Sequence, residues 1–117
     1  MTAKRDVGLY LEDILESIKR IEQYTHNISE KEFSNNGDKQ DAVVYRLEVI
    51  GEAIKNIPQA YRSNHPEVLW SDIAKTRDKI IHHYFEVDCE QVWTIIQNDL
   101  QPLKGTIQQM LTELDKR

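Results

Sequence analysis

Apolar residues recur at helical spacing along most of this chain. From Val7 they fall at i, i+4, i+7, i+11 and i+14, and one face of a helix repeats at this interval. The members of this first stripe are Val7, Leu11, Ile14, Ile18 and Ile21. A second stripe with the same spacing consists of Val43, Leu47, Ile50, Ile54 and Ile57. The stripes predict two long amphipathic helices, the second over about residues 40–56 with Asp38 or Asp41 as its N-cap.

Start and stop signals divide the segments between the stripes. Ser29 and Glu32 have the spacing of a capping box and open a short helix, which ends in an Asn- and Gly-rich loop. The segment 58–70 holds two prolines, and it is predicted to be a surface connector with a short helix around residues 59–62.

Two further long helices are expected in the second half of the chain. One is predicted from about Asp72 to Phe85. The other follows a capping box at Asp88, and its apolar stripe runs to the C-terminus with a bend near Pro102. Gly51 lies inside the second long helix, where glycine costs roughly 1 kcal/mol against alanine, so we expect another helix to approach it closely.

Composition narrows the fold class. The chain holds only four glycines and three prolines, too few for the frequent turns of a sandwich or barrel of short strands. Hydrophobic residues make up 39% and charged residues 30% of its 117 residues, which is typical of an ordinary folded domain. We therefore predict an all-α fold, an up-and-down bundle of four to five main helices that forms a single domain over residues 1–117.

The chain carries no signal for a membrane or an oxidising compartment. No apolar run approaches the ~20 residues of a membrane span, and the first residues lead into an amphipathic segment. The single cysteine, Cys89, excludes an intrachain disulfide and a thiolate cluster. A cytoplasmic protein is expected. The net charge of -5 argues at first sight against a nucleic-acid partner, yet residues 75–84 sum to +2 before either histidine is protonated.

One arginine falls on the apolar face of the third predicted helix. The apolar members of this face are Ile73, Ala74, Ile80, Ile81, Tyr84 and Phe85. Arg77 would lie in their midst, and burying an unpaired guanidinium costs several kcal/mol. Arg77 must therefore either pair with an acid, for which Glu48 and Glu52 are candidates, or face a cleft.

Chemically versatile side chains gather around this arginine. Arg77, His82, His83 and Tyr84 lie within eight residues. An imidazole can accept and donate protons near neutral pH, and an arginine can direct two donors onto a phosphate. These groups could cleave RNA without a metal ion. On a straight helix His82 lies ~140° from Arg77 and would by itself be a solvent-facing histidine. The helix must loosen near Ile81, or the site must be shared across a two-fold interface.

Two other chemical interpretations are weaker. A metal site could use His82 and His83 with His26, His65 or Asp88, but adjacent histidines on a helix point ~100° apart. Cys89 is an isolated thiol without a dedicated base, so a structural cysteine is expected. Trp70 and Trp93 are most simply core or interface aromatics.

The ordered motifs of the chain resemble those of the HEPN ribonuclease superfamily, and within it the HepT-like toxins of HEPN/MNT toxin–antitoxin modules. The signature is Arg77 with the polar Asp78, then His82 and, two residues on, Tyr84. The other matching segments are Leu11–Tyr24, Gln40–Ala53, Trp70 with Asp72–Ile73, Val87–Asp88 with Val92–Trp93, and Asn98–Leu100. The resemblance covers essentially the whole chain.

The resemblance implies a fold, an activity and a regulation. It implies a homodimeric HEPN bundle with Arg77 and His82 of both subunits in an interface cleft. It further implies a metal-independent endoribonuclease without a cofactor, which acts as the toxin of a type VII-like module. Asp78 would have a supporting role. Tyr84 would receive AMP from the cognate MNT nucleotidyltransferase antitoxin, and the added charge and bulk would block RNA. Without the resemblance, Tyr84 would be interpreted as a core residue, because it lies on the apolar face of the third predicted helix.

A different class of function is open. The chain could be a non-catalytic helical dimer that serves as a binding or regulatory subunit of a nucleotidyltransferase, with Arg77 in a structural role. Arg77 and His82 occur together here, which favours catalysis.

Overall fold

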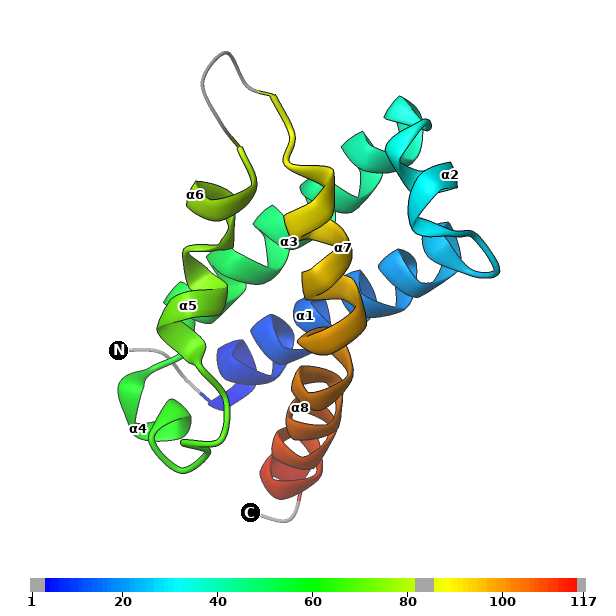
Figure 1. Cartoon of the computed structure of the whole chain (residues 1–117). Helices are drawn as coiled ribbons and strands as arrows, with labels where there is room; N and C mark the ends of the chain where they lie inside the picture. Colours follow the sequence, from blue (N-terminus) through cyan, green and yellow to red (C-terminus); the bar gives the residue numbers. More distant parts are fainter. Residues whose placement is uncertain (1–3, 82–85, 116–117) are drawn as a thin grey trace.

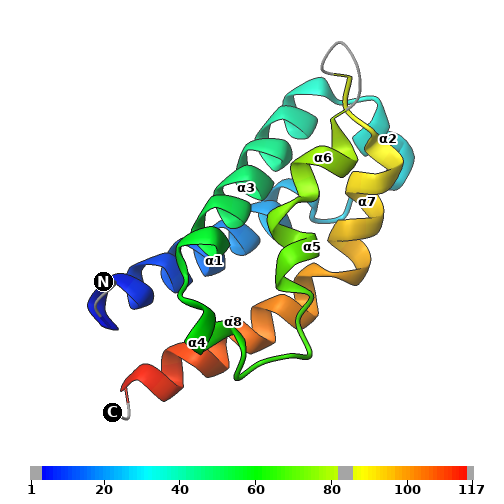
Figure 2. The ribbon, with the colours of Figure 1, turned by 90° about the vertical axis from the view of Figure 1, so that its left-hand side faces the viewer.

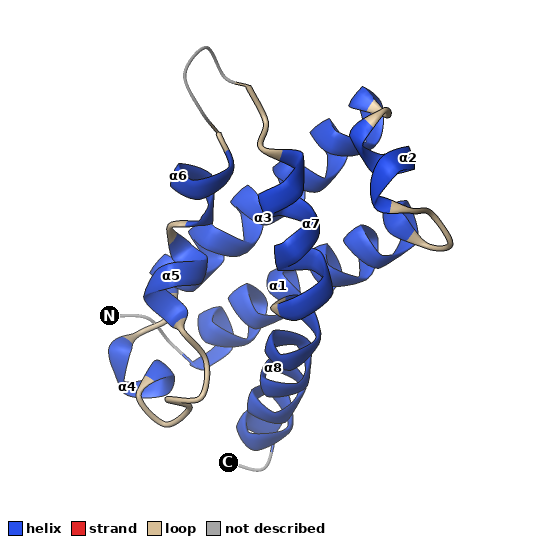
Figure 3. Ribbon diagram, in the orientation of Figure 1, coloured by secondary structure: helices blue, strands red, loops and turns tan. Residues whose placement is uncertain are grey.

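The fold was obtained as a computed structural model, which describes residues 4–81 and 86–115. These residues form helices and connecting loops, with a single isolated β-bridge between Ile81 and Val87 (Figure 3). The helices are α1 Lys4–Thr25, α2 Glu30–Ser34, α3 Gly37–Asn56, α4 Gln59–Arg62, α5 Trp70–Ala74, α6 Thr76–Ile80, α7 Cys89–Asn98 and α8 Leu100–Asp115. The predicted all-α fold is confirmed.

The two N-terminal stripes form the centre of the core. α3 runs back along α1, and α8 packs against α1 from the other side (Figures 1 and 2). All five apolar positions of the first stripe are fully buried, and those of the second are buried as well. Burying a Leu or Ile side chain contributes about 1.5–3 kcal/mol, so these two helices hold much of the hydrophobic stabilisation.

The starts of the short helices follow local capping rules. Ser29 accepts from the backbone N–H of Glu32, and the Glu32 side chain accepts from the N–H of Ser29, so the predicted capping box is confirmed. The N-cap of α3 is Asn36, whose side chain accepts from the N–H of Lys39 at 3.0 Å. The prediction of Asp38 or Asp41 was therefore wrong. Gln40 donates to the carbonyl of Phe33 at 2.9 Å, which holds the turn and starts the helix earlier.

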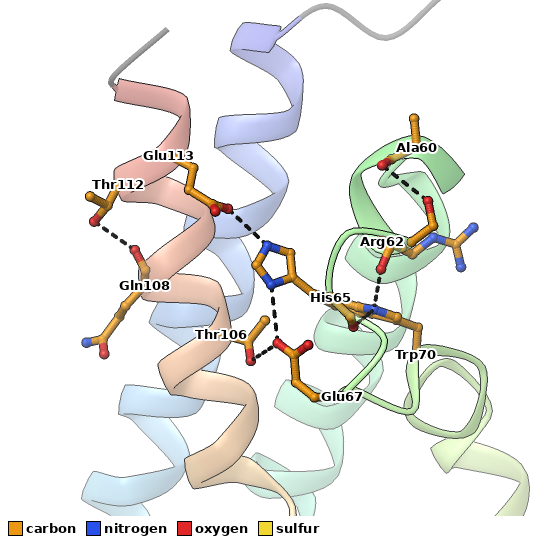
Figure 4. Close-up of polar contacts among 10 residues, drawn as sticks. Ala60, Arg62, His65, Glu67, Trp70, Thr106, Gln108, Thr112 and Glu113 are labelled. Carbon is orange, nitrogen blue, oxygen red and sulfur yellow. Dashed lines mark hydrogen bonds and ion pairs between the residues drawn. The ribbon is translucent and has the colours of Figure 1, made fainter.

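The connector between α3 and α5 is fastened by buried polar groups. Its short helix α4 forms where it was predicted. The Trp70 indole N–H donates to the carbonyls of Arg62 at 3.1 Å and His65 at 3.0 Å (Figure 4). The side chain of His65 is 7% exposed, and its imidazole lies between the carboxylates of Glu67 and Glu113. The connector is thereby tied to α8.

The third long helix, predicted from Asp72 to Phe85, is interrupted. α5 ends at Ala74, Lys75 leaves the helical conformation, and α6 ends at Ile80. Ile81 is extended, with φ −108° and ψ 117°. The carbonyl of Ile80 accepts the N–H of Asp88 at 2.7 Å, so it is bonded across the chain and not to the next helical turn. Ile80 and Ile81 are both β-branched, and such residues favour extended backbone over helix.

The C-terminal stripe is divided into two helices. α7 begins at Cys89, where Asp88 caps it by accepting the N–H of Gln91 at 3.1 Å. The helix breaks at Asp99, three residues before the predicted bend at Pro102. Proline has no N–H to donate to the carbonyl four residues earlier, which is that of Asn98, so the interruption falls one turn ahead of the proline.

Candidate functional site

Arg77 lies on α6 and contacts α3. Its Nε donates to Oε1 of Glu48 at 3.1 Å, and the two side chains are 54% and 42% exposed. Of the alternatives posed by the sequence, pairing with Glu48 is the one observed. The expectation that Arg77 lies within an apolar stripe was wrong, because the break at Lys75 turns α6 relative to α5. The guanidinium is therefore accessible to a ligand.

Close packing of α5 on α3 sets the position of this arginine. A Cβ atom placed on Gly51 would lie 3.2 Å from the carbonyl oxygen of Ala74, the last residue of α5. Real Cβ atoms rarely come so close, so glycine allows the two helices to meet here. The close approach expected at Gly51 is confirmed. It places the start of α6 directly beside the part of α3 that carries Glu48.

Hydrogen bonds join the chain at the end of α6 to the residues that precede α7. Ile81 and Val87 form an antiparallel bridge, and the N–H of Asp88 donates to Ile80. His82 follows Ile81 directly in the sequence. His82, His83 and Tyr84 lie outside the described residues, so the expectations for them remain predictions. A straight helix no longer fixes an angle of ~140° between Arg77 and His82, because the helix ends before His82.

The described surface around Arg77 is mixed in charge. Lys75, Asp78 and Lys79 are exposed, and Asp78 lies in the first turn of α6. On the far side of Glu48 an open hollow of about 360 Å³ runs between α1 and α3, and its charged groups are Asp13, Glu48 and Glu52. Anionic groups avoid such acidic surroundings, so an anionic ligand would approach Arg77 from the α6 side.

The side chains considered for a metal site lie apart from one another. His26 is exposed beyond α1, whereas His65 is buried with its two ring nitrogens on different carboxylates. Within residues 4–81 and 86–115 no group of three or more metal-binding side chains converges.

Burial, and to a smaller extent the charge of Asp88, raise the pKa of the Cys89 thiol. A raised pKa disfavours the thiolate and hence a nucleophilic role.

The two tryptophans are structural. Trp70 is 7% exposed and bonds to the connector. Trp93 packs on Phe33 with ring centroids 5.6 Å apart. Both agree with the core or interface role expected of them.

Sequence reasoning missed the pairing that closes the chain between Ile81 and Val87. A usable signal was present, since Ile80, Ile81 and Val87 are β-branched and favour extended backbone. The helical periodicity of the preceding residues obscured it.

None of the helices in the part of the chain that the structure describes is long and apolar enough to cross a membrane.

Comparisons with known proteins give a consistent result. A family model described as ribonuclease HepT-like matches residues 14–110. "Probable ribonuclease HepT" of Thermococcus cleftensis is 43% identical over 107 residues, which are 92% of this chain and 97% of that protein. A "Putative RNase" of Methanocaldococcus jannaschii is 38% identical over 96% of this chain and 93% of its own length.

One similar protein is longer. "Gamma-glutamylcyclotransferase and putative RNase" of Methanocaldococcus jannaschii is 42% identical over 113 residues. These are 97% of this chain and 51% of that protein, so the chain spans about half of its length. No solved structure matches the chain.

Proposed function

This chain belongs to the HepT-like ribonuclease family, and from that membership we propose that it cleaves RNA endonucleolytically without a metal ion. The family and the enzyme class expected from the sequence are confirmed by the same matches. The proposal treats residues 1–117 as one catalytic domain, with Arg77 and His82 as the catalytic residues and Asp78 in support.

The observation that carries the proposal is the placement of Arg77. Its guanidinium is half exposed, oriented by Glu48, and five residues ahead of His82 in the sequence. A guanidinium has five N–H donors, and the bond to Glu48 uses the one on Nε. The remaining donors suit the oxygens of a scissile phosphate, whose negative charge grows as a fifth oxygen attacks.

His82 would supply the proton transfers. An imidazole takes the proton of the ribose 2′-hydroxyl as the 2′-oxygen attacks phosphorus, and an imidazolium gives a proton to the departing 5′-oxygen. The products would be a 2′,3′-cyclic phosphate and a 5′-hydroxyl. In a homodimer the two copies of His82 could divide these roles in one cleft, with both copies of Arg77 bound to phosphate.

We further propose that the chain is the toxin of a type VII-like HEPN/MNT module. The hydroxyl oxygen of Tyr84 would attack the α-phosphorus of ATP on the MNT nucleotidyltransferase, forming tyrosyl-AMP and releasing pyrophosphate and a proton. Tyr84 is two residues from His82, so the added phosphodiester would bring negative charge next to the catalytic pair. RNA phosphates would then be repelled.

Cleavage assays test the catalytic part. Partner-free protein should cut RNA in the presence of a chelator, and both His82→Ala and Arg77→Ala should abolish cutting. His26→Ala is the matched control, since His26 is an exposed histidine outside the proposed site. Equal cleavage by the wild type and His82→Ala would refute the catalytic assignment of His82, whereas no cleavage by the wild type would support the non-catalytic dimer that binds a nucleotidyltransferase. Sedimentation at several concentrations tests the homodimer.

A mass measurement tests the regulation. After incubation with the partner nucleotidyltransferase and ATP, the peptide that holds Tyr84 should gain the mass of AMP, and RNA cleavage should fall. Tyr84→Phe should gain none, whereas Tyr45→Phe, which changes an exposed tyrosine on α3, should behave as wild type. An undiminished mass gain in Tyr84→Phe would refute the assignment.

A further inference from the structure

A cavity of about 460 Å³ lies on the side of α6 that faces away from α3. Its walls are the loop 67–69, helices α5 and α6, the end of α7 and the start of α8. Figure 2 shows α6 next to α7. Thr76 and Lys79 line it from α6, whereas Arg77 of the same helix bonds to Glu48 of α3. The cavity therefore lies on another side of α6 than the Arg77–Glu48 pair, and its volume falls in the range of small-molecule sites.

The floor of this cavity is apolar. Val68, Ile95 and Leu103 line it and are 8%, 8% and 1% exposed, and Ile73 and Pro102 extend the apolar surface toward the rim. An apolar group that enters would cover side chains already held rigidly by the core. The floor thus favours a ligand with an apolar body.

The rim of the cavity is predominantly negative. It carries the carboxylates of Glu67, Asp72 and Asp99 against the single ammonium of Lys79, so the formal net charge of the lining is −2. Glu67 is engaged by His65 at 3.2 Å and by the Thr106 hydroxyl at 3.3 Å. Asp72 and Asp99 are exposed and line the cavity from different elements, one on α5 and the other between α7 and α8. Both carboxylates would attract a cationic group in the cavity.

Two uncharged groups add acceptors to the same cavity. Thr76 is 4% exposed, and its hydroxyl reaches the Asp72 carbonyl at 3.5 Å, the outer limit of a hydrogen bond. Its oxygen therefore keeps the capacity to accept a further bond. Asn98, the last residue of α7, also lines the cavity, and carbonyl groups at a helix C-terminus carry partial negative charge. Pro102 cannot donate an N–H to the Asn98 carbonyl.

We propose that this cavity binds a small organic cation, an ammonium group carried on a compact apolar body. The apolar part covers Ile95 and Leu103, and the ammonium lies between Asp72 and Asp99 within reach of the Thr76 hydroxyl. Asp72, Ile73, Asn98 and Asp99 all line this cavity, and the ribonuclease mechanism proposed above does not use them. The proposal does not depend on RNA cleavage.

Ligand titrations followed by amide NMR test the site. The probes are phenethylamine, its neutral analogue 2-phenylethanol and its anionic analogue 3-phenylpropionate. Phenethylamine should shift the amide signals of Ile73, Thr76 and Asn98 with saturation, and the two analogues should bind about threefold more weakly or worse. Added salt should weaken the amine alone. Equal binding of all three probes, or shifts that map elsewhere, would overturn the proposal.

Charge variants sharpen the test. Asp72→Asn and Asp99→Asn should each weaken phenethylamine binding by about threefold while leaving 2-phenylethanol unchanged. Glu12→Gln is the matched control, because it removes one exposed carboxylate on α1 away from the cavity. If either aspartate variant fails to fold, the comparison of the three probes on the wild type still decides the question. Unchanged amine binding in both aspartate variants would refute the placement of the ammonium.

Discussion

Nε of Arg77 lies 3.1 Å from Oε1 of Glu48, although 29 residues separate them in the chain. The bond joins α6 to α3 and orients a guanidinium that is otherwise half exposed. An exposed pair of this kind adds only about 0.2–1 kcal/mol to stability. Its main effect is to restrict the conformations of Arg77.

Removing the Glu48 carboxylate should therefore affect RNA cleavage more than folding. We expect Glu48→Ala to lower kcat by roughly tenfold, because a misplaced phosphate-binding group loses much of its effect. Glu48→Gln keeps an oxygen acceptor and should recover part of the rate. The melting temperature should change little in either variant. Glu52→Ala is the control one turn further along α3, and a loss of activity there equal to that in Glu48→Ala would contradict a specific role for Glu48.

A side chain at Gly51 should separate α5 from α3. Its Cβ already lies 3.2 Å from the Ala74 carbonyl oxygen, so Gly51→Val should destabilise the protein by about 1–3 kcal/mol in urea unfolding. Gly105→Ala is the contrasting control, since nothing lies within 4 Å of a Cβ there and α8 should gain up to about 1 kcal/mol. Destabilisation of both variants alike would argue against a close contact at Gly51.

The buried imidazole of His65 should hold the connector on α8. Its nitrogens lie 3.2 Å from Glu67 and 2.9 Å from Glu113, and its carbonyl accepts the Trp70 indole N–H (Figure 4). His65→Ala keeps this carbonyl but removes the imidazole that joins Glu67 to Glu113, and we expect a loss of about 1–3 kcal/mol in the free energy of unfolding. Hydrogen exchange of the Trp70 indole should also accelerate. An indole that exchanges as slowly as in the wild type would show that the connector is held elsewhere.

Stability should depend on pH through the contact between α1 and α8. Lys104 Nζ lies 3.0 Å from Glu22, and Gln101 donates to the same carboxylate. Burial raises the pKa of Glu22, but the bonds from Lys104 and Gln101 outweigh it, and the pKa lies below its ordinary value. A lowered pKa contributes stability above the ordinary glutamate range, and this is lost as pH falls through the folded-state pKa.

Glu22→Gln should therefore cost about 0.5–1 kcal/mol near neutral pH and nothing in strong acid. Urea unfolding of both proteins across an acid series measures the difference. Glu12→Gln, which changes an exposed glutamate on the same helix, should show no such trend. A difference that stays constant with pH would remove Glu22 as its source.

Cys89 should be a slow nucleophile at neutral pH. Burial and the neighbouring Asp88 carboxylate raise the pKa of its thiol. Its alkylation by iodoacetamide should thus be slower than that of free cysteine and should rise at higher pH. Asp88→Asn keeps an oxygen that can cap α7 and removes the charge, so the rate should increase. A thiol that reacts faster than free cysteine would contradict this environment.

The sequence by itself determined the helical class and most of the core. The stripes of Val7–Ile21 and Val43–Ile57 define which face of each helix is buried, because a period of 3.6 residues leaves only one face that can enter a core. The Ser29 cap and the short helix after Pro58 were also predictable from local chemistry. The family followed from the order of short motifs along the chain.

Only the tertiary structure decided where the third helix breaks and what Arg77 contacts. Local periodicity could not reveal that the Ile80 carbonyl bonds to Asp88, or that Gly51 admits the end of α5. These contacts join residues far apart in sequence, and they override helix propensities that differ by less than about 1 kcal/mol per residue. They end α6 before His82 and turn Arg77 toward Glu48.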